Sequence, residues 1–140
     1  MYKNILIPLD GSELAEQSLD GIFELSHWHE TKIILLQVLE IFTLSSSSKD
    51  IEYGRLKEKA EEYLNEIKAK LEKKGMKDVE LVIERGKPNA EICSYTERDD
   101  VDFVAMTTHG LGGMMSWALG SVTEKVVRHS AKPVLIFRSK

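Results

Sequence analysis

The sequence has little cysteine and proline, and it has no long hydrophobic run. Its 140 residues include a single cysteine, Cys93, and only three prolines. One cysteine excludes an internal disulfide, as is usual for proteins of a reducing compartment. The opening stretch MYKNILIPLD has an apolar run of a few residues, far shorter than a signal peptide or a membrane span requires. We therefore expect a cytoplasmic protein with no membrane segment.

The sequence also lacks an excess of basic charge. Its formal net charge is −4, so the composition does not indicate a nucleic-acid partner. Hydrophobic residues make up 42% and charged residues 30% of the chain, which is ordinary for a globular protein. The length suits one domain with a sizeable core, and we expect a single domain over residues 1–140.

What the sequence does contain is a regular alternation of hydrophobic runs and amphipathic helical patterns. Five runs rich in Ile, Leu and Val predict buried strands over residues 4–9, 32–39, 79–86, 101–106 and 133–137. Helical patterns lie between them, after Ser12 and over residues 51–74, 88–98 and 121–130, whereas the polar stretch 43–50 predicts a loop. This order favours an α/β fold with one doubly wound, five-stranded parallel sheet and helices on both faces.

Two loops of the predicted sheet carry residues suited to a ligand. PLDGS follows the first strand, and MTTHGLGGMMSWALGSVTEK follows the fourth and holds four glycines between Gly110 and Gly120. In open α/β sheets, ligands bind outside the carboxyl ends of the strands. Asp10, in the first loop, could hold Mg²⁺ or a ribose hydroxyl there. Both loops are therefore candidate parts of one site.

The glycine-rich loop has the features of a phosphate cradle. Ser121 and Glu124 have the spacing of a capping box, which predicts a helix start. Such a start favours an anion by about 0.3–1 kcal/mol through the helix dipole. Glycines let backbone N–H groups approach phosphate oxygens closely. The loop is neither a Walker A motif nor a G-x-G-x-x-G fingerprint, so simple turn formation is the alternative at this point.

With these features, the sequence resembles the universal stress protein family in its small single-domain form. The stretches that carry the resemblance, in order, are NILIPLDGSELAEQSL, LLQVLE, RGKPNAEIC and DVDFVAMTTHG followed by LGSVTEKVVRHSAKPVLIFR. Together they cover nearly the whole chain. The resemblance implies a Rossmann-like sheet with the strand order 3-2-1-4-5, of the adenine nucleotide alpha hydrolase-like kind.

Nucleotide-binding members of this family carry the motif G-x2-G-x9-G-(S/T). Here Gly110, Gly120 and Ser121 fall in register with it, and Thr107 stands at the first glycine position. The resemblance implies an ATP pocket between the first and fourth strands, with Mg²⁺ or Mn²⁺ beside the nucleotide, Asp10 near the phosphates or metal, and backbone groups of Val38 at the adenine edge. The full set of implied binding residues is Pro8, Leu9, Asp10, Val38, Met106, Thr107, His109, Gly110, Gly113, Gly120, Ser121 and Val122.

The resemblance also implies a homodimer. In the family, the last strand commonly pairs across a two-fold axis, and here that strand runs from Pro133 to Phe137. Its apolar character suits an edge strand that is covered by a partner. A further protein partner is expected for a stress-response adaptor, although the sequence does not identify it.

Other candidate residues have an ordinary structural interpretation beside a functional one. His109 is either an acid–base group or a packed loop side chain, and HWHE (27–30) is either a metal site or a surface corner. Cys93 is either a core residue or a reactive thiol. MMSWAL (114–119) is either a helical turn packed on the sheet or a surface for a partner.

Three functions are compatible with this sequence. The first is a stress protein that binds ATP and acts as a nucleotide-dependent sensor or adaptor. The second is a dimeric interaction module without nucleotide, which Thr107 would favour by closing the pocket. The third is a slow ATPase or phosphotransferase, for which the sequence shows no positioned general base or arginine finger.

Overall fold

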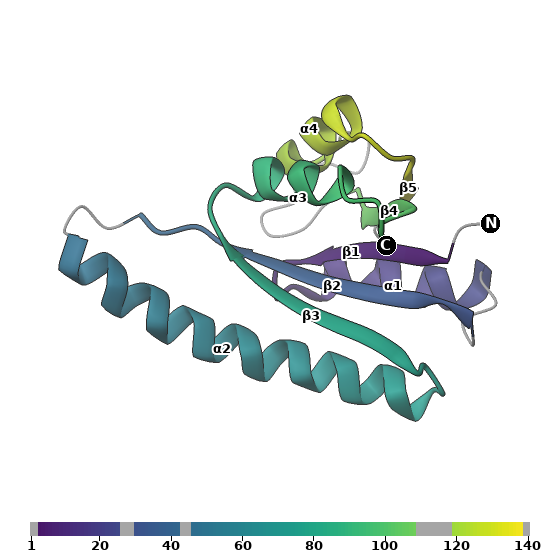
Figure 1. Cartoon of the computed structure of the whole chain (residues 1–140), viewed down its shortest axis with the longest axis horizontal. Helices are drawn as coiled ribbons and strands as arrows, with labels where there is room; N and C mark the ends of the chain where they lie inside the picture. The colour runs from purple at the N-terminus through teal and green to yellow at the C-terminus, as the bar shows by residue number, and fades with distance from the viewer. Residues whose placement is uncertain (1–2, 26–29, 43–45, 109–118, 139–140) are drawn as a thin grey trace.

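The computed structural model describes residues 3–25, 30–42, 46–108 and 119–138. Strands and helices alternate along them as the sequence predicts (Figure 1). In chain order they are β1 (Asn4–Leu9), α1 (Glu13–Leu25), β2 (Lys32–Leu39), α2 (Ser46–Lys73), β3 (Asp78–Arg85), α3 (Pro88–Thr96), β4 (Phe103–Thr107), α4 (Ser121–His129) and β5 (Val134–Phe137).

The five strands form one parallel sheet in the order β3-β2-β1-β4-β5. This confirms the strand order that the family resemblance implies. The central strand β1 pairs with β2 on one side, where Leu9 lies beside Gln37, and with β4 on the other, where Leu6 lies beside Val104. Because all strands run the same way, their carboxyl ends share one edge of the sheet. Any site built from the loops after several strands must lie at that edge.

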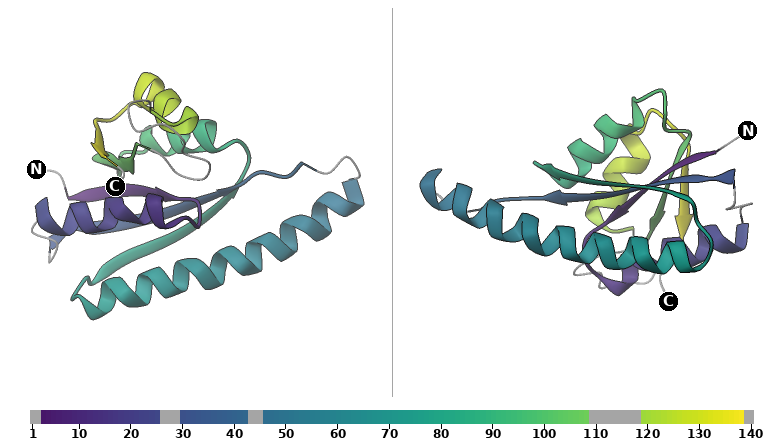
Figure 2. Two further views of the ribbon diagram at one scale, coloured as in Figure 1. Left: turned by 180° about the vertical axis from the view of Figure 1, so that it is seen from behind. Right: turned by 60° about the horizontal axis from the view of Figure 1, so that its bottom comes forward.

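Helices cover both faces of the sheet, as predicted. Helices α1 and α2 lie on one face, and α3 and α4 lie on the other (Figure 2). The central strands are buried on both sides, and Ile33, Ile34, Leu35 and Leu36 of β2 are consecutive residues with almost no exposed surface. A continuous apolar run of this kind is typical of a strand that is covered on both faces.

Helix α2 begins earlier than the sequence predicts. The stretch 43–50 was expected to be a loop, but the helix begins at Ser46, while residues 43–45 lie outside the described part of the chain. Its amino-terminal end projects beyond the sheet (Figure 1). Arg85 at the end of β3 also contacts this end, because its guanidinium lies 3.5 Å from Asp50 and 5.1 Å from the Tyr53 ring centre. Both contacts lie in the first turns of the helix, next to the end of β3.

The carboxyl end of α2 is closed by Gly75. Gly75 has a φ of +98°, and its N–H donates to the Glu72 carbonyl at 2.9 Å. The next N–H, of Met76, reaches back to the Leu71 carbonyl at 3.0 Å, and both side chains are buried. This is a Schellman-type end, which satisfies carbonyls that the helix leaves without partners.

Strand β5 contacts α1 at a position that requires glycine. A Cβ added to Gly21 would overlap the ring of Phe137, so the helix and the end of the strand approach each other more closely than any side chain allows. The strand starts at Val134 rather than at the predicted Pro133, although the Pro133 carbonyl still accepts a hydrogen bond from Val104. The last strand is thus fixed against both β4 and α1.

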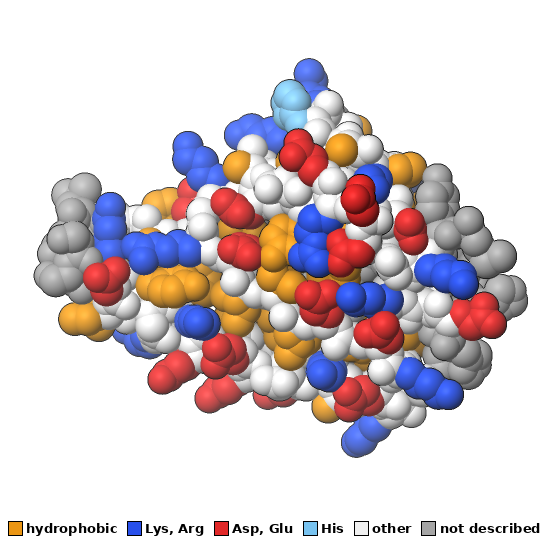
Figure 3. Space-filling model, in the orientation of Figure 1, with side chains coloured by type: hydrophobic (Ala, Val, Ile, Leu, Met, Phe, Trp, Pro, Cys, Tyr) orange, Lys and Arg blue, Asp and Glu red, His pale blue; other side chains and the backbone are white. Residues whose placement is uncertain are grey.

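Charges of both signs are interspersed over the face of the molecule seen in Figure 3. A strip of hydrophobic side chains crosses this face over β2 and β3, framed by acidic and basic groups. Two large hydrophobic side chains are strongly exposed, Phe42 after β2 and Ile51 in α2. Within the described ranges, every helix is too short or too polar to cross a membrane.

One carboxylate joins the starts of β1 and β4 at the opposite edge from the carboxyl ends. Asp102 Oδ2 accepts the N–H groups of both Lys3 and Asn4 at 2.8 Å, and the Asp102 N–H donates to the Asn4 carbonyl at 2.9 Å. The two N–H bonds to the carboxylate, from Asn4 first and then Lys3, lower the pKa of Asp102 below its ordinary value. The charged form of Asp102 therefore stabilises the folded chain.

We expect Asp102→Asn to lower the free energy of unfolding by about 1 kcal/mol at pH 7, because the bonds to N–H groups lose their charge assistance. A group whose folded pKa is lowered contributes stability above its unfolded pKa, near 3.9, and loses it as the pH falls through the folded pKa. The difference between variant and wild type will therefore shrink below about pH 4. Urea unfolding at several pH values measures this difference in the free energy of unfolding. The exposed Asp99→Asn is the control, and an equal loss in both variants would contradict this role.

Candidate functional site

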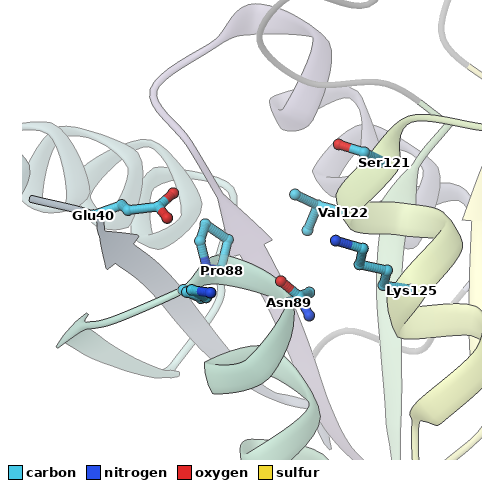
Figure 4. Close-up of a pocket in the computed structure, with 7 residues that line it drawn as sticks. Glu40, Pro88, Asn89, Ser121, Val122 and Lys125 are labelled. Atoms are coloured by element: carbon cyan, nitrogen blue, oxygen red, sulfur yellow. The ribbon is translucent and has the colours of Figure 1, made fainter. Parts of the chain in front are cut away.

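The carboxyl edge of the sheet holds a cavity of about 270 Å³ between α3 and α4. Its residues come from the segment after β2, from the start of α3 and from the start of α4 (Figure 4). The lining residues are Glu40, Lys87, Pro88, Asn89, Ser121, Val122 and Lys125. From β1 the chain first adds β2 and β3 on one side of the sheet and then β4 and β5 on the other. Open α/β sheets bind ligands at the point where the strand order switches sides in this way.

The start of α4 presents backbone N–H groups to this cavity. Gly120 is the N-cap residue, and no side chain among the described residues caps the helix. The first backbone bond runs from the Glu124 N–H to the Gly120 carbonyl at 2.9 Å, so the N–H groups of the first turn have no partner within the helix. They and the positive end of the helix dipole favour an anion at this position.

The capping box predicted from Ser121 and Glu124 is therefore wrong. Ser121 is the first residue of the helix, one position beyond the cap. The Glu124 carboxylate does not reach back to the helix start, because it forms an ion pair at 3.0 Å with Arg128 one turn later. The S-x-x-E spacing is compatible with a serine at the N-cap or at the first helical position, and here Gly120 is the N-cap residue.

The ends of segment 109–119 are held together by the backbone. The Gly120 N–H donates to the Thr108 carbonyl at 2.7 Å, and the Thr108 N–H donates to the Phe137 carbonyl at 2.9 Å. The Thr123 hydroxyl donates to the Thr107 carbonyl at 3.0 Å, which fastens α4 to the end of β4. The predicted phosphate loop thus leaves β4 and returns to α4 at adjacent points.

Thr107 fits its position without strain. Its side chain is only 5% exposed, and no non-glycine residue in the described part of the chain has a positive φ. Glycine's conformational freedom is not needed at this point. The Thr107 side chain packs in the core at the end of β4, and the cavity-lining residues do not include it.

Asp10 and Ser12 form the turn that starts α1. The Asp10 carboxylate accepts the backbone N–H of Ser12 at 2.9 Å and also its hydroxyl, while the Ser12 hydroxyl oxygen accepts the Ala15 N–H at 3.1 Å. Gly11 between them has a φ of +86°, which favours glycine. Ser12 therefore caps α1. The Asp10 carboxylate lies at the carboxyl edge but does not line the cavity.

Helix α3 is held in place by contacts on both of its sides. The Tyr95 hydroxyl donates to Glu84 of β3 at 2.8 Å, and Thr96 Oγ1 accepts the Ala131 N–H at 2.9 Å. Burial, followed by the bond to Glu84, raises the pKa of Tyr95 to about 12, so this hydroxyl remains a donor at neutral pH. The wall that α3 contributes to the cavity is thereby fixed between β3 and the segment after α4.

The structure brings only part of the predicted site into the cavity. Ser121 and Val122 line it, and Gly120 lies directly before them. The other described residues of the set lie at the carboxyl ends of their strands without lining it: Pro8, Leu9, Asp10, Val38, Met106 and Thr107. Leu9 and Met106 are buried in the two hydrophobic cores. His109, Gly110 and Gly113 lie outside the described residues.

Five residues that line the cavity were not in the predicted set: Glu40, Lys87, Pro88, Asn89 and Lys125. For Lys125 a signal was present, because it follows Ser121 by one helical turn and so shares its face. Lys87 and Asn89 flank Pro88, which starts α3 as predicted at the same sheet edge. Nothing in the sequence indicates that the starts of α3 and α4 meet across one cavity.

The remaining candidates have these outcomes. Cys93 is half-buried and packs beside the core on the α3 side, and burial raises the pKa of its thiol, so it stays protonated rather than reactive. Of HWHE, only Glu30 is described, and of MMSWAL, only the exposed Leu119. Among the described residues, no three His, Cys, Asp or Glu side chains gather at metal-binding distance.

Two solved structures with a similar fold contain an adenine nucleotide. A protein from Arabidopsis thaliana solved with AMP bound is 21% identical to the chain, covering 99% of this chain and 92% of that one, with a TM-score of 0.74. A universal stress protein solved in complex with cAMP is 20% identical, covering 99% of this chain and 98% of that one, with a TM-score of 0.69. At these identities, the likeness to this chain is one of fold.

A nearer relative is universal stress protein MJ0577 from Methanocaldococcus jannaschii. It is 34% identical over 158 residues, which cover the whole of this chain and 97% of that protein. The solved structure of MJ0577 superposes with a TM-score of 0.89 over the whole of this chain and 98% of that one, at 35% identity. The universal stress protein family model matches residues 1–138. The chain therefore belongs to the universal stress protein family.

Proposed function

We propose that the chain binds ATP at the carboxyl edge of its sheet and acts as a nucleotide-dependent adaptor in a stress response. The observation that carries this proposal is the cavity lined by the uncapped first turn of α4. Backbone N–H groups at a helix start are suited to phosphate oxygens. Two relatives of the same fold bind AMP and cAMP, which share the adenosine part of ATP.

The dimensions of the cavity suit a part of the nucleotide. Its volume of about 270 Å³ lies just below the ~300–1,000 Å³ of typical small-molecule pockets. We assign the phosphate end to Ser121 and Val122, and the base to the carboxyl ends of β1 and β2 near Pro8 and Val38. The phosphate loop that includes Gly110 and Gly113 would complete the cradle.

A metal ion would enter with the nucleotide. Mg²⁺ is commonly held by one or two carboxylates together with phosphate oxygens and water. Asp10 offers one such carboxylate at the end of β1, in the turn that it forms with Ser12. Mg²⁺ or Mn²⁺ would screen the phosphate charge there. We assign no hydrolytic step, and the chain is proposed to work by binding.

Calorimetric titration of nucleotide-stripped protein with ATP, with and without Mg²⁺, tests this function. We expect a dissociation constant near ~1 μM, about −8 kcal/mol. Gly120→Val will weaken binding at least about tenfold, because a branched side chain would crowd the N–H groups of α4. The φ of −62° at Gly120 accepts valine, so the fold will persist.

Gly54→Val on α2 is the matched control, since a Cβ there meets open space. It will leave ATP binding unchanged. No heat and no thermal shift at millimolar ATP in the wild type would contradict the function and would favour the interaction module without nucleotide.

We also propose that the chain forms a homodimer through β5. This strand is last in the sheet and is half-buried along its length. Val104 and Thr108 donate their N–H groups to the carbonyls of Pro133 and Phe137, so these alternate positions face β4. The backbone groups of Val134 and Ile136 then face outward. A second copy related by a two-fold axis would pair with them in antiparallel fashion.

Ile136→Pro tests this pairing, because it removes an outward N–H without removing a bond to β4. We expect the wild type to sediment as a dimer at micromolar concentration and Ile136→Pro to sediment mainly as a folded monomer. Ile136→Val, which keeps the N–H, is the control and will remain dimeric. A monomeric wild type, or a proline variant that stays fully dimeric, would contradict the proposed interface.

A further inference from the structure

The cavity between α3 and α4 contains two cationic side chains from different helices. Lys87 immediately precedes α3, and Lys125 lies one turn into α4. The Lys125 ammonium points into the gap between the two helices (Figure 4). In the part of the chain that the structure describes, neither lysine forms an ion pair. Both charges are therefore available to a ligand in the cavity.

The acidic residue of the cavity lies on the other side. Glu40 follows β2, and Figure 4 shows its carboxylate across the gap from Lys125. No described cation pairs with Glu40 either. The charge of the cavity thus changes from negative beside β2 to positive beside α3 and α4. A ligand with one anionic end has a single favourable orientation in such a field.

We propose that Lys87 and Lys125 together bind the polyphosphate chain of the nucleotide, so that the site prefers ATP to AMP. This inference rests on the proposed function and adds its specificity. It differs from a cradle made only of α4 and the glycine-rich loop, because it assigns a phosphate contact to the start of α3.

The physical basis is the number of phosphate charges within reach of the ammonium groups. Each added phosphate brings further negative charge, which attracts a nearby ammonium group. AMP places one phosphate near α4, where backbone N–H groups supply most of the contacts to it. ATP extends further and gains from both lysines. Glu40 repels the phosphate chain and leaves the nucleoside end beside β2.

The start of α3 supports this assignment. Lys87 is its N-cap residue in extended conformation, and no described side chain caps the helix. Pro88 at the first position has no N–H, so Asn89 contributes the first backbone donor, and its side-chain amide lines the cavity as well. The two helix starts thus present donors and positive charge to the same space.

Calorimetric titrations with AMP, ADP and ATP, all with Mg²⁺, test the inference. We expect the wild type to bind ATP at least about tenfold more tightly than AMP. Lys87→Ala and Lys125→Ala will each weaken ATP about fivefold and AMP less than twofold. Glu40→Gln will act in the opposite direction and tighten ATP. Arg128→Ala is the matched control, because Arg128 lies one turn further along α4, pairs with Glu124 and does not line the cavity.

Higher salt gives a second readout, because it will reduce the ATP preference of the wild type more than that of the double variant Lys87→Ala/Lys125→Ala. If the wild type binds ATP but the double variant keeps the same ratio of ATP to AMP affinity, the inference is overturned and the proposed function stands. If the wild type binds neither nucleotide, both are overturned.

Discussion

The parallel pairing of β1 with β2 on one side and β4 on the other determines where every other element lies. Because β1 and β4 run parallel, the chain segments that lead from them to α1 and α4 leave from the same sheet edge. The hydrophobic cores on the two faces, which centre on residues such as Ile5 and Leu6, fix this pairing. Asp102 reinforces it at the opposite edge by accepting the N–H groups that start β1.

The site follows from that constraint. Parallel strands bring the starts of α3 and α4 to one edge, although Pro88 and Ser121 are far apart in the chain. Hydrogen bonds then hold the geometry. The Thr123 hydroxyl fastens α4 to the end of β4, and the Gly120 N–H donates to the Thr108 carbonyl, which brings together the two ends of the glycine-rich segment. The cavity is therefore built from rigid elements, and its donors need little rearrangement to receive a ligand.

Much of the fold could be predicted from the sequence. Runs such as ILIPL and KIILL specify strands buried on both faces, and their alternation with helical patterns leaves few topologies. Strand order came from the family resemblance, since periodicity does not determine which strands are neighbours. The start of α2 at Ser46 was not predicted, because the serine-rich stretch before Ile51 has no apolar periodicity that indicates a helix.

The candidate site was predicted less completely than the fold. Ser121 was singled out as a helix start after glycine and Val122 through the family resemblance, and both line the cavity, although the capping box itself was wrong. Lys87 and Asn89 were not found, because their importance depends on a cavity that exists only once α3 packs beside α4. Thr107 stands at a glycine position of the family motif, and its side chain is buried at the end of β4.

The most direct test of the account is where ATP binds. Nuclear magnetic resonance of ¹⁵N-labelled protein, titrated with ATP and Mg²⁺, would follow each backbone amide. The account predicts that the largest shifts fall on Asn89, Ser121 and Val122, the amides that meet at the cavity. Saturable binding whose largest shifts fall away from the starts of α3 and α4, for example at the projecting end of α2, would contradict it.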